Sequence, residues 1–244
     1  MKNKPIVIYY SPMVGTGKHY HSATLFNDTL RPVLTDLKKN KTDLGSQQSF
    51  FSCRAFLGFN KNLYMITNPF DIDVNINDFG QIVNNGNKEL DGLFNNRLKQ
   101  IENCKNFNYE YYYFFYSEES VEIETMSPFM HESDFTKNAY IVPGSFNISK
   151  WFRPINPEIQ FLPNHDNHVV SQKNDPLLYI RFKTDRPVIL KQFFMPRELM
   201  DVSESIVSYK QYEQNKTFAY LYGLFSNSPL PNRILRLIKD NLVE

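Results

Sequence analysis

The clearest hydrophobic pattern in the chain is an alternation that begins at Phe70. Phe70, Ile72, Val74 and Ile76 alternate with Asp and Asn side chains. A period of two over eight residues predicts a half-buried β-strand. The apolar run Ile6–Tyr10 near the start of the chain predicts another strand.

Two longer segments are each typical of a β-hairpin. Residues 107–126 read FNYEYYYFFYSEESVEIETM, with a turn expected at Ser117–Ser120. Residues 177–194 read LLYIRFKTDRPVILKQFF, with a turn at residues 183–187 and Pro187 opening the return strand. The tyrosine run also resembles a stacking platform for single-stranded nucleic acid. Its flanking glutamates would repel phosphate, so a core or interface strand is favoured.

Helical periodicity replaces strand alternation after Pro196, a residue well placed at a helix start. Apolar residues recur there every three or four positions in two stretches, which predicts two C-terminal helices. The segment SNSPLPN separates them, and Asn232 is the expected N-cap of the second. The recurring residues are Leu199, Val202, Ile206 and Tyr209 in the first helix, and Ile234, Ile238 and Leu242 in the second.

Strands followed by helices predict a mainly β (α+β) fold. We expect an antiparallel β-sandwich or a jelly-roll-like barrel with two C-terminal helices, because the alternating β–α rhythm of a parallel sheet is absent. Residues 1–195 form the expected β-rich domain, and residues 196–244 a helical appendage packed on it. The Asn- and Gly-rich residues 80–105 predict a loop insertion, with a short helix near Leu90–Ile101.

Charge and cysteine usage narrow the class of protein. The chain of 244 residues has 27 basic and 26 acidic side chains, which gives no electrostatic argument for binding nucleic acid or a membrane. No apolar run approaches the ~18 residues that span a bilayer, and the opening run is too short for a signal peptide. Cys53 and Cys104 lie far apart and predict reduced thiols. We therefore expect a soluble cytoplasmic protein, not a secreted one.

The Gly-Thr-Gly-Lys sequence at residues 15–18 follows a hydrophobic run, as in a phosphate-binding loop. Such a loop needs Gly-x-x-x-x-Gly-Lys-Ser/Thr, so that backbone N–H groups point at phosphate and a hydroxyl holds Mg²⁺. Pro12 stands in place of the first glycine, and His19 in place of the hydroxyl residue. Because proline has no N–H and a fixed φ, we do not expect nucleotide binding.

A second candidate chemistry is a mononuclear iron site built from two histidines and a carboxylate. Surface histidines in polar loops are the simpler interpretation of the same residues. The candidate ligands are His131, Asp134, His165, Asp166 and His168.

Part of this set resembles the 2-oxoglutarate-dependent oxygenases of the double-stranded β-helix fold. His168 followed by Arg181 is similar to the distal half of that family's motif, in which the basic residue binds the cosubstrate carboxylate. The proximal half departs from the motif, because Ser133 stands where the carboxylate belongs and Asp134 is one residue late. In a strand, one residue separates the two faces. The resemblance implies an enzyme that uses Fe(II) and 2-oxoglutarate with a degenerate metal motif.

Trp151 and Arg153 are candidates for ligand binding, with Arg181 as a third. Trp151 is the only tryptophan, which indicates a core or pocket anchor. Arg153 lies between Phe152 and Pro154 and can bind a carboxylate or a phosphate bidentately. The alternative role for Arg153 is to hold its loop by donating to backbone carbonyls.

The stretches VPGSFNISKWFRPINPEIQF and DPLLYIRFKTDRPVILKQF, within Pro143–Phe194, resemble hypothetical proteins of tailed bacteriophages that infect marine bacteria. Phe51–Phe70 is a weaker companion. The resemblance implies a phage origin, and therefore a location in the host-cell cytoplasm or in association with the virion. It supplies no catalytic residue. We therefore expect a non-enzymatic accessory or structural protein that acts through a protein partner or self-association and needs no cofactor. The oxygenase is the alternative, and a ligand-binding barrel without chemistry is a third.

Overall fold

The first of two large sheets is mixed, with the strand order β13-β9-β1-β17 and with β2 paired to β1. Strand β1 pairs in parallel with β17 and antiparallel with β9 and β2. The computed structural model describes residues 4–16, 19–22, 30–39, 50–77, 81–95, 106–162 and 167–243. The strands of this sheet are β1 (Ile6–Thr16), β2 (His19–Ser22), β9 (Tyr111–Tyr116), β13 (Pro154–Ile155) and β17 (Val188–Gln192).

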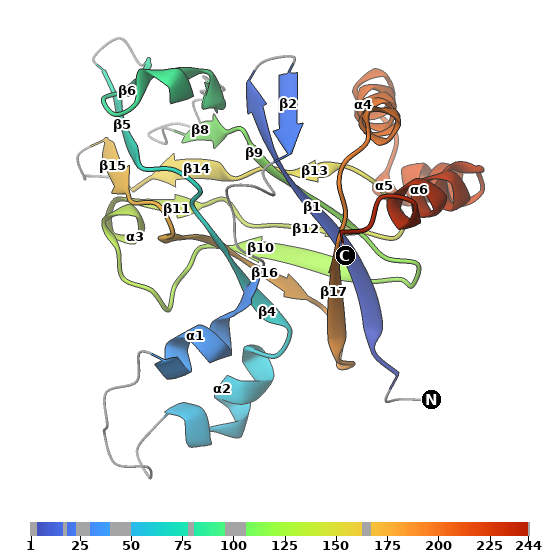
Figure 1. The fold of residues 1–244 in the computed structure, drawn as a ribbon, viewed down its shortest axis with the longest axis horizontal. Coiled ribbons are helices and arrows are strands. Elements are labelled where there is room, and N and C mark those ends of the chain that lie inside the picture. The colour runs from blue at the N-terminus through green and yellow to red at the C-terminus, as the bar shows by residue number, and fades with distance from the viewer. Residues whose placement is uncertain are drawn as a thin grey trace.

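The second large sheet is antiparallel throughout, with the order β12-β10-β16-β4-β3. In Figure 1 its β4 end leads down to α1 (Val33–Lys39) and α2 (Arg54–Phe59). Its strands are β3 (Arg31–Pro32), β4 (Leu63–Thr67), β10 (Glu122–Met126), β12 (Gly144–Asn147) and β16 (Pro176–Phe182).

Two smaller antiparallel sheets complete the β-structure, with the orders β11-β14-β8-β7 and β15-β5-β6. The 3-10 helices Phe50–Ser52 and Lys88–Leu93 and helix α3 (Asp134–Asn138) lie in the connections. The strands are β5 (Ile72–Ile76), β6 (Ile82–Asn84), β7 (Phe94–Asn95), β8 (Asn106–Tyr109), β11 (Ala139–Ile141), β14 (Glu158–Phe161) and β15 (His168–Ser171).

Strand β9, with the sequence YYYFFY, is buried on both faces. Side chains alternate between the faces of a strand, and here each face enters a different apolar cluster. Tyr111, Tyr113 and Phe115 join the main core, where Phe115 packs edge-on against Phe182 of the second sheet at 5.6 Å between ring centroids. Tyr112, Phe114 and Tyr116 face the other way, into the second cluster. The prediction that this run is a core strand is confirmed.

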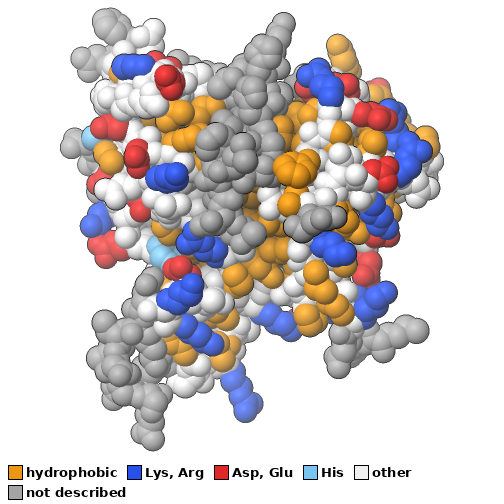
Figure 2. Space-filling view, viewed as in Figure 1, with side chains coloured by type: hydrophobic (Ala, Val, Ile, Leu, Met, Phe, Trp, Pro, Cys, Tyr) orange, Lys and Arg blue, Asp and Glu red, His pale blue; other side chains and the backbone are white. Residues whose placement is uncertain are grey.

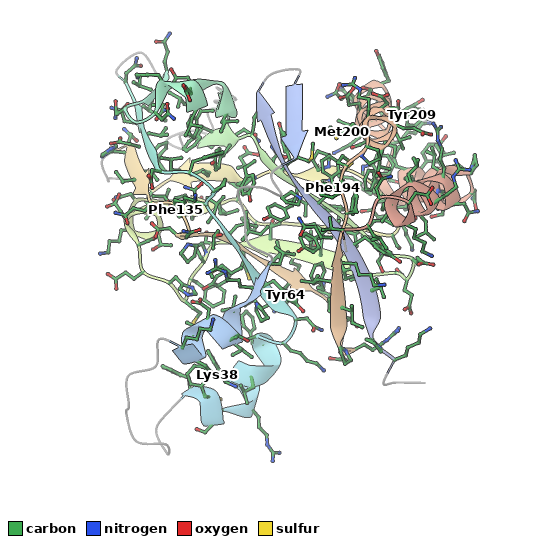
Figure 3. The ribbon with its side chains drawn as sticks, in the orientation of Figure 1. Lys38, Tyr64, Phe135, Phe194, Met200 and Tyr209 are labelled. Carbon is green, nitrogen blue, oxygen red and sulfur yellow. The ribbon has the colours of Figure 1, made fainter. Side chains whose placement is uncertain are left out.

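Three C-terminal helices cover the second face of the first sheet, on the right in Figure 1. They are α4 (Arg197–Tyr212), α5 (Phe218–Ser226) and α6 (Leu230–Lys239). Figure 3 labels Phe194 just before α4, and Met200 and Tyr209 on it. Met200 is buried, whereas Tyr209 is 41% exposed. The side chains that pack against the sheet include Leu199, Met200, Ile206, Leu221, Phe225, Ile234 and Ile238.

Both predicted hairpins are wrong. Strands β9 and β10 flank the Ser117–Ser120 turn but lie in different sheets, and so do β16 and β17 on either side of residues 183–187. Each turn therefore carries the chain from one sheet to the other. Alternation identifies a strand and its buried face, but it does not identify the neighbouring strand.

The C-terminal region also differs from the prediction of two helices. Helix α5 has the sequence FAYLYGLFS, in which nearly every side chain is apolar or aromatic, so it shows little helical periodicity. The middle of SNSPLPN, residues 227–229, separates α5 from α6. Asn232 lies inside α6, which begins at Leu230 after Pro229. Helix α4 begins directly after Pro196, as predicted.

The mixed α+β class and the antiparallel strands are confirmed. The parallel pairing of β1 with β17 was not expected, since no β–α–β unit precedes it. The described strands form open sheets and no closed barrel, and the jelly-roll connectivity stays a prediction. The predicted loop insertion contains β6, a 3-10 helix and β7; its residues 80 and 96–105 lie outside the described ranges, as does the second half of the predicted helix near Leu90–Ile101.

Substituting Phe115→Ala tests whether β9 organises the core. The side chain is fully buried and contacts Tyr10, Tyr113 and Phe182. We expect a loss of about 3–5 kcal/mol in the free energy of unfolding, measured by urea denaturation, because the deletion leaves a cavity. The matched control is Tyr212→Ala, whose side chain is 88% exposed and should cost less than about 0.5 kcal/mol. Equal losses for the two variants would contradict the assignment of β9 to the core.

Candidate functional site

Two adjoining cavities lie in the helical layer and share Trp151 and Leu221. The first, of about 550 Å³, lies between α4, α5 and α6 and is mostly apolar. The second, of about 390 Å³, lies beneath the connection from α4 to α5 and carries basic side chains. The apolar cavity is lined mainly by Trp151, Val202, Ile206, Leu221, Leu224, Phe225 and Leu230. The basic cavity is lined by Arg153, Lys210, Glu213, Lys216 and Phe218 among others.

Trp151 and Arg153 are positioned by a short segment that is anchored at both ends. On the upstream side, Asn147 Oδ1 accepts from the backbone N of Ser149 at 3.0 Å and from its hydroxyl at 2.7 Å, which closes the turn after β12. On the downstream side, Pro154 restricts Arg153 to an extended backbone and pairs with β9 through Phe114. The indole of Trp151 packs 6.3 Å from the ring of Phe225. The prediction that Trp151 anchors a core or a pocket is confirmed.

Arg153 is a half-buried cation. Its guanidinium carbon lies 4.4 Å from the ring centroid of Phe146, a cation–π contact. Its Nε is enclosed and has no acceptor within the described ranges, and the same holds for Nε1 of Trp151. Burial lowers the pKa of Arg153, with an opposing contribution from Tyr222. The alternative in which Arg153 holds its loop through backbone carbonyls is wrong for the part of the chain that the structure describes.

Lys210 of α4 adds a second charge to the basic cavity. Burial lowers the pKa of Lys210, and the positive charge of Arg153 lowers it further. Its Nζ lies 4.8 Å from the ring centroid of Phe218, and Nζ of Lys216 lies 5.1 Å from that of Tyr220. Glu213 lines the same cavity, but forms no ion pair with these cations in the described structure. The cavity therefore presents an excess of positive charge.

The residues of the hypothetical iron site are engaged with separate partners. His131 shares a hydrogen bond with the Tyr179 hydroxyl through Nδ1, and its Nε2 lies 2.9 Å from Asp36 Oδ2. Nε2 of His168 lies 2.7 Å from Asp73 Oδ1. Asp134 Oδ2 accepts from the backbone N of Val170 at 3.0 Å. No group of three metal-ligating side chains gathers among the described residues; His165 and Asp166 lie outside them.

Arg181 is held by an ion pair across two strands. It lies directly opposite Glu124 and donates from Nε to Glu124 Oε2 at 2.9 Å, with a second hydrogen bond from the guanidinium to the same oxygen. Its guanidinium carbon lies 4.8 Å from the ring centroid of Phe59. The hydrogen bonds from Arg181 are the main reason that the pKa of Glu124 is lowered. Arg181 is thus apart from the cavities beside Trp151.

Sequence reasoning missed both Lys210 and the hydrogen-bonded chain Asp36–His131–Tyr179. Lys210 lies on the predicted helix α4, but its approach to Arg153 depends on how α4 packs over the segment before β13. Asp36 and His131 are 95 positions apart in sequence, and no local pattern pairs them. Both features depend on packing between distant elements.

No family model, curated protein or solved structure matches this chain. Within the described ranges, no helix combines the length and the hydrophobicity needed to cross a membrane. The chemistry of the two cavities and of the surface around them is therefore the basis for the functional proposal.

The Arg181–Glu124 pair generates a prediction about pH. The pKa of Glu124 is lowered in the folded chain, so its contribution to stability is complete above the unfolded pKa of roughly 4.3 and is lost as pH falls through the folded value. We expect Glu124→Gln to lower the free energy of unfolding by about 1 kcal/mol at pH 7. That difference should shrink below about pH 4, measured by urea denaturation at several pH values. A difference that does not vary with pH would contradict this assignment.

Proposed function

We propose that this chain is a non-enzymatic accessory or structural protein of phage type that acts by binding another protein through the face formed by α4 and α5. The observation that carries the proposal is a concentration of exposed large hydrophobic side chains on this face. We call this set the aromatic rim: Tyr209, Tyr212, Phe218, Tyr220 and Leu224. A contiguous exposed apolar surface of this kind marks interaction sites.

The aromatic rim borders the apolar cavity, and this combination suits a protein partner. Tyr209 and Leu224 belong to the rim and also line the cavity, together with the buried Trp151. Tyrosine and tryptophan contribute large contact areas and are enriched where binding energy is concentrated. An apolar side chain from a partner would fill the cavity while the rim excludes water around it. On the face seen in Figure 2, hydrophobic side chains also gather over β1 and β17.

The charged side chains at the two ends of α4 indicate which kind of partner segment would bind. At the end of α4 nearest α5, Lys210 and Lys216 have no carboxylate partner within the described ranges, and Arg153 lies beneath them. At the other end, the charges are balanced, since Arg233 pairs with Glu198 at 2.7 Å and Arg197 with Asp201 at 2.8 Å. A partner segment with apolar side chains followed by acidic ones matches this arrangement. The phage origin is supported separately, by the resemblance of Pro143–Phe194.

A displayed peptide library, selected on the full chain, tests the partner chemistry. We expect enrichment of sequences that combine apolar residues with Asp or Glu, with micromolar affinity in fluorescence anisotropy. Tyr212→Ser combined with Leu224→Ser should weaken the selected peptides at least about tenfold, since exposed anchors of an interface carry much of its binding energy. The matched control is Phe50→Ser, a 73% exposed aromatic side chain elsewhere on the chain, which should leave affinity unchanged.

Two outcomes would contradict the proposal. The first is peptide binding that survives the Tyr212 and Leu224 substitutions, which would place the interface elsewhere. The second is a dimer in light scattering that the same substitutions convert to a monomer, which would make a second copy of this chain the occupant of the face.

A further inference from the structure

We infer that the basic cavity beside Trp151 is a binding site for an oxyanion, a carboxylate or a phosphate, whose charge is met by Arg153 and Lys210. This inference does not depend on the protein partner proposed above. A free small anion and the acidic group of a partner would satisfy the same chemistry, and the experiment below separates them.

The positive charge on Arg153 is not balanced by a carboxylate among the described residues. Other arginines of the chain show how a guanidinium is normally satisfied, because Arg181 holds Glu124 and Arg186 holds Glu119. Arg153 is also partly buried, with its Nε enclosed, yet it has no carboxylate partner among the described residues. A buried charge without a counter-ion is destabilising. An anion in the cavity would remove that penalty.

The positively charged Lys210 lies close to Arg153. Lys210 reaches the same cavity from α4, near enough to Arg153 for the two charges to repel each other. Two cations that face one cavity are each more stable when an anion lies between them. Arginine also offers paired donors that match the oxygens of a carboxylate or a phosphate.

The size and the lining of the basic cavity suit an organic anion. Its volume of about 390 Å³ is more than a single inorganic ion fills, so an organic anion with a small body is accommodated. Trp151 and Phe218 supply apolar surface for that body. Glu213 lies on the lining too, and its carboxylate would oppose the ligand. Neutralising Glu213 should therefore strengthen binding.

Trp151 provides a direct readout, because it is the only tryptophan in the chain and lines the cavity. The full chain is titrated with inorganic phosphate and, separately, with benzoate, at an ionic strength held constant with chloride. We expect a saturable change in tryptophan fluorescence. Arg153→Met should abolish saturation, and Glu213→Gln should lower the dissociation constant at least twofold. The matched control is Arg186→Met, which removes an arginine distant from Trp151 and should leave the titration unchanged.

The melting temperature of Arg153→Met shows whether a loss of anion binding comes from the missing guanidinium or from a failure to fold. In chloride buffer without the test anions, Arg153→Met should melt at or above the temperature of the unsubstituted chain, because it removes an uncompensated buried charge. If Arg153→Met does not fold, Arg153→Lys keeps the charge without the paired donors and should weaken binding at least fivefold. A fluorescence change that is linear in anion concentration, or one that is equally saturable without Arg153, would overturn the inference.

Competition identifies the source of the anion. If benzoate displaces an acidic peptide selected on the aromatic rim, and Arg153→Met weakens that peptide, the site holds a partner's carboxylate. If benzoate or phosphate binds while the peptide is unaffected, the site holds a free small anion. If the rim variants lose peptide binding but keep the saturable fluorescence response to benzoate or phosphate, the two sites are separate.

Discussion

The burial of strand β9 on both faces is the constraint on which the rest of the structure depends. Every side chain of β9 is aromatic, and successive side chains point to opposite faces of the strand. The strand therefore needs an apolar layer on each side. The second sheet supplies one layer and helices α4–α6 supply the other. The tyrosine hydroxyls find partners within these layers, since Tyr111 and Tyr113 bond each other at 3.1 Å and Tyr116 donates to the Pro231 carbonyl at 3.3 Å. The helical layer is thus an integral part of the core.

The candidate site follows from the same constraint. Strand β13 pairs with β9 at the edge of the first sheet, and the residues just before it carry Trp151 and Arg153 under the helices. The helices exclude water from the sheet. This strengthens the electrostatic interactions of any charged group that lies beneath them. An arginine at this edge is therefore a strong electrostatic feature, although the chain as a whole has a formal net charge of only +1. The resemblance to an oxygenase motif involved residues far from this edge.

The sequence was a good guide to individual elements and a poor guide to their neighbours. Alternation located β5, the apolar run located the start of β1, and Pro196 located the start of α4. The strand partners were wrong in both predicted hairpins, because pairing is decided by which faces must be covered across the whole fold. Helix α5 was missed because its exposed side is as apolar as its buried side, so its sequence has no polar face to reveal a helical period. Trp151 and Arg153 stood out by residue type, whereas Lys210 became significant only through packing.

The parallel pairing of β1 with β17 has a consequence for how the protein is made. Ile6 pairs with Val188, and Tyr10 with Gln192, so β1 acquires this neighbour only after the whole segment between the two strands has been synthesised. Contacts between such distant segments slow folding. Until then, the aromatic strand β9 lacks β16 of the second sheet, which packs on one of its faces, and the C-terminal helices, which cover the other. We therefore expect the nascent chain to expose aromatic surface during this interval, a state that is prone to aggregation.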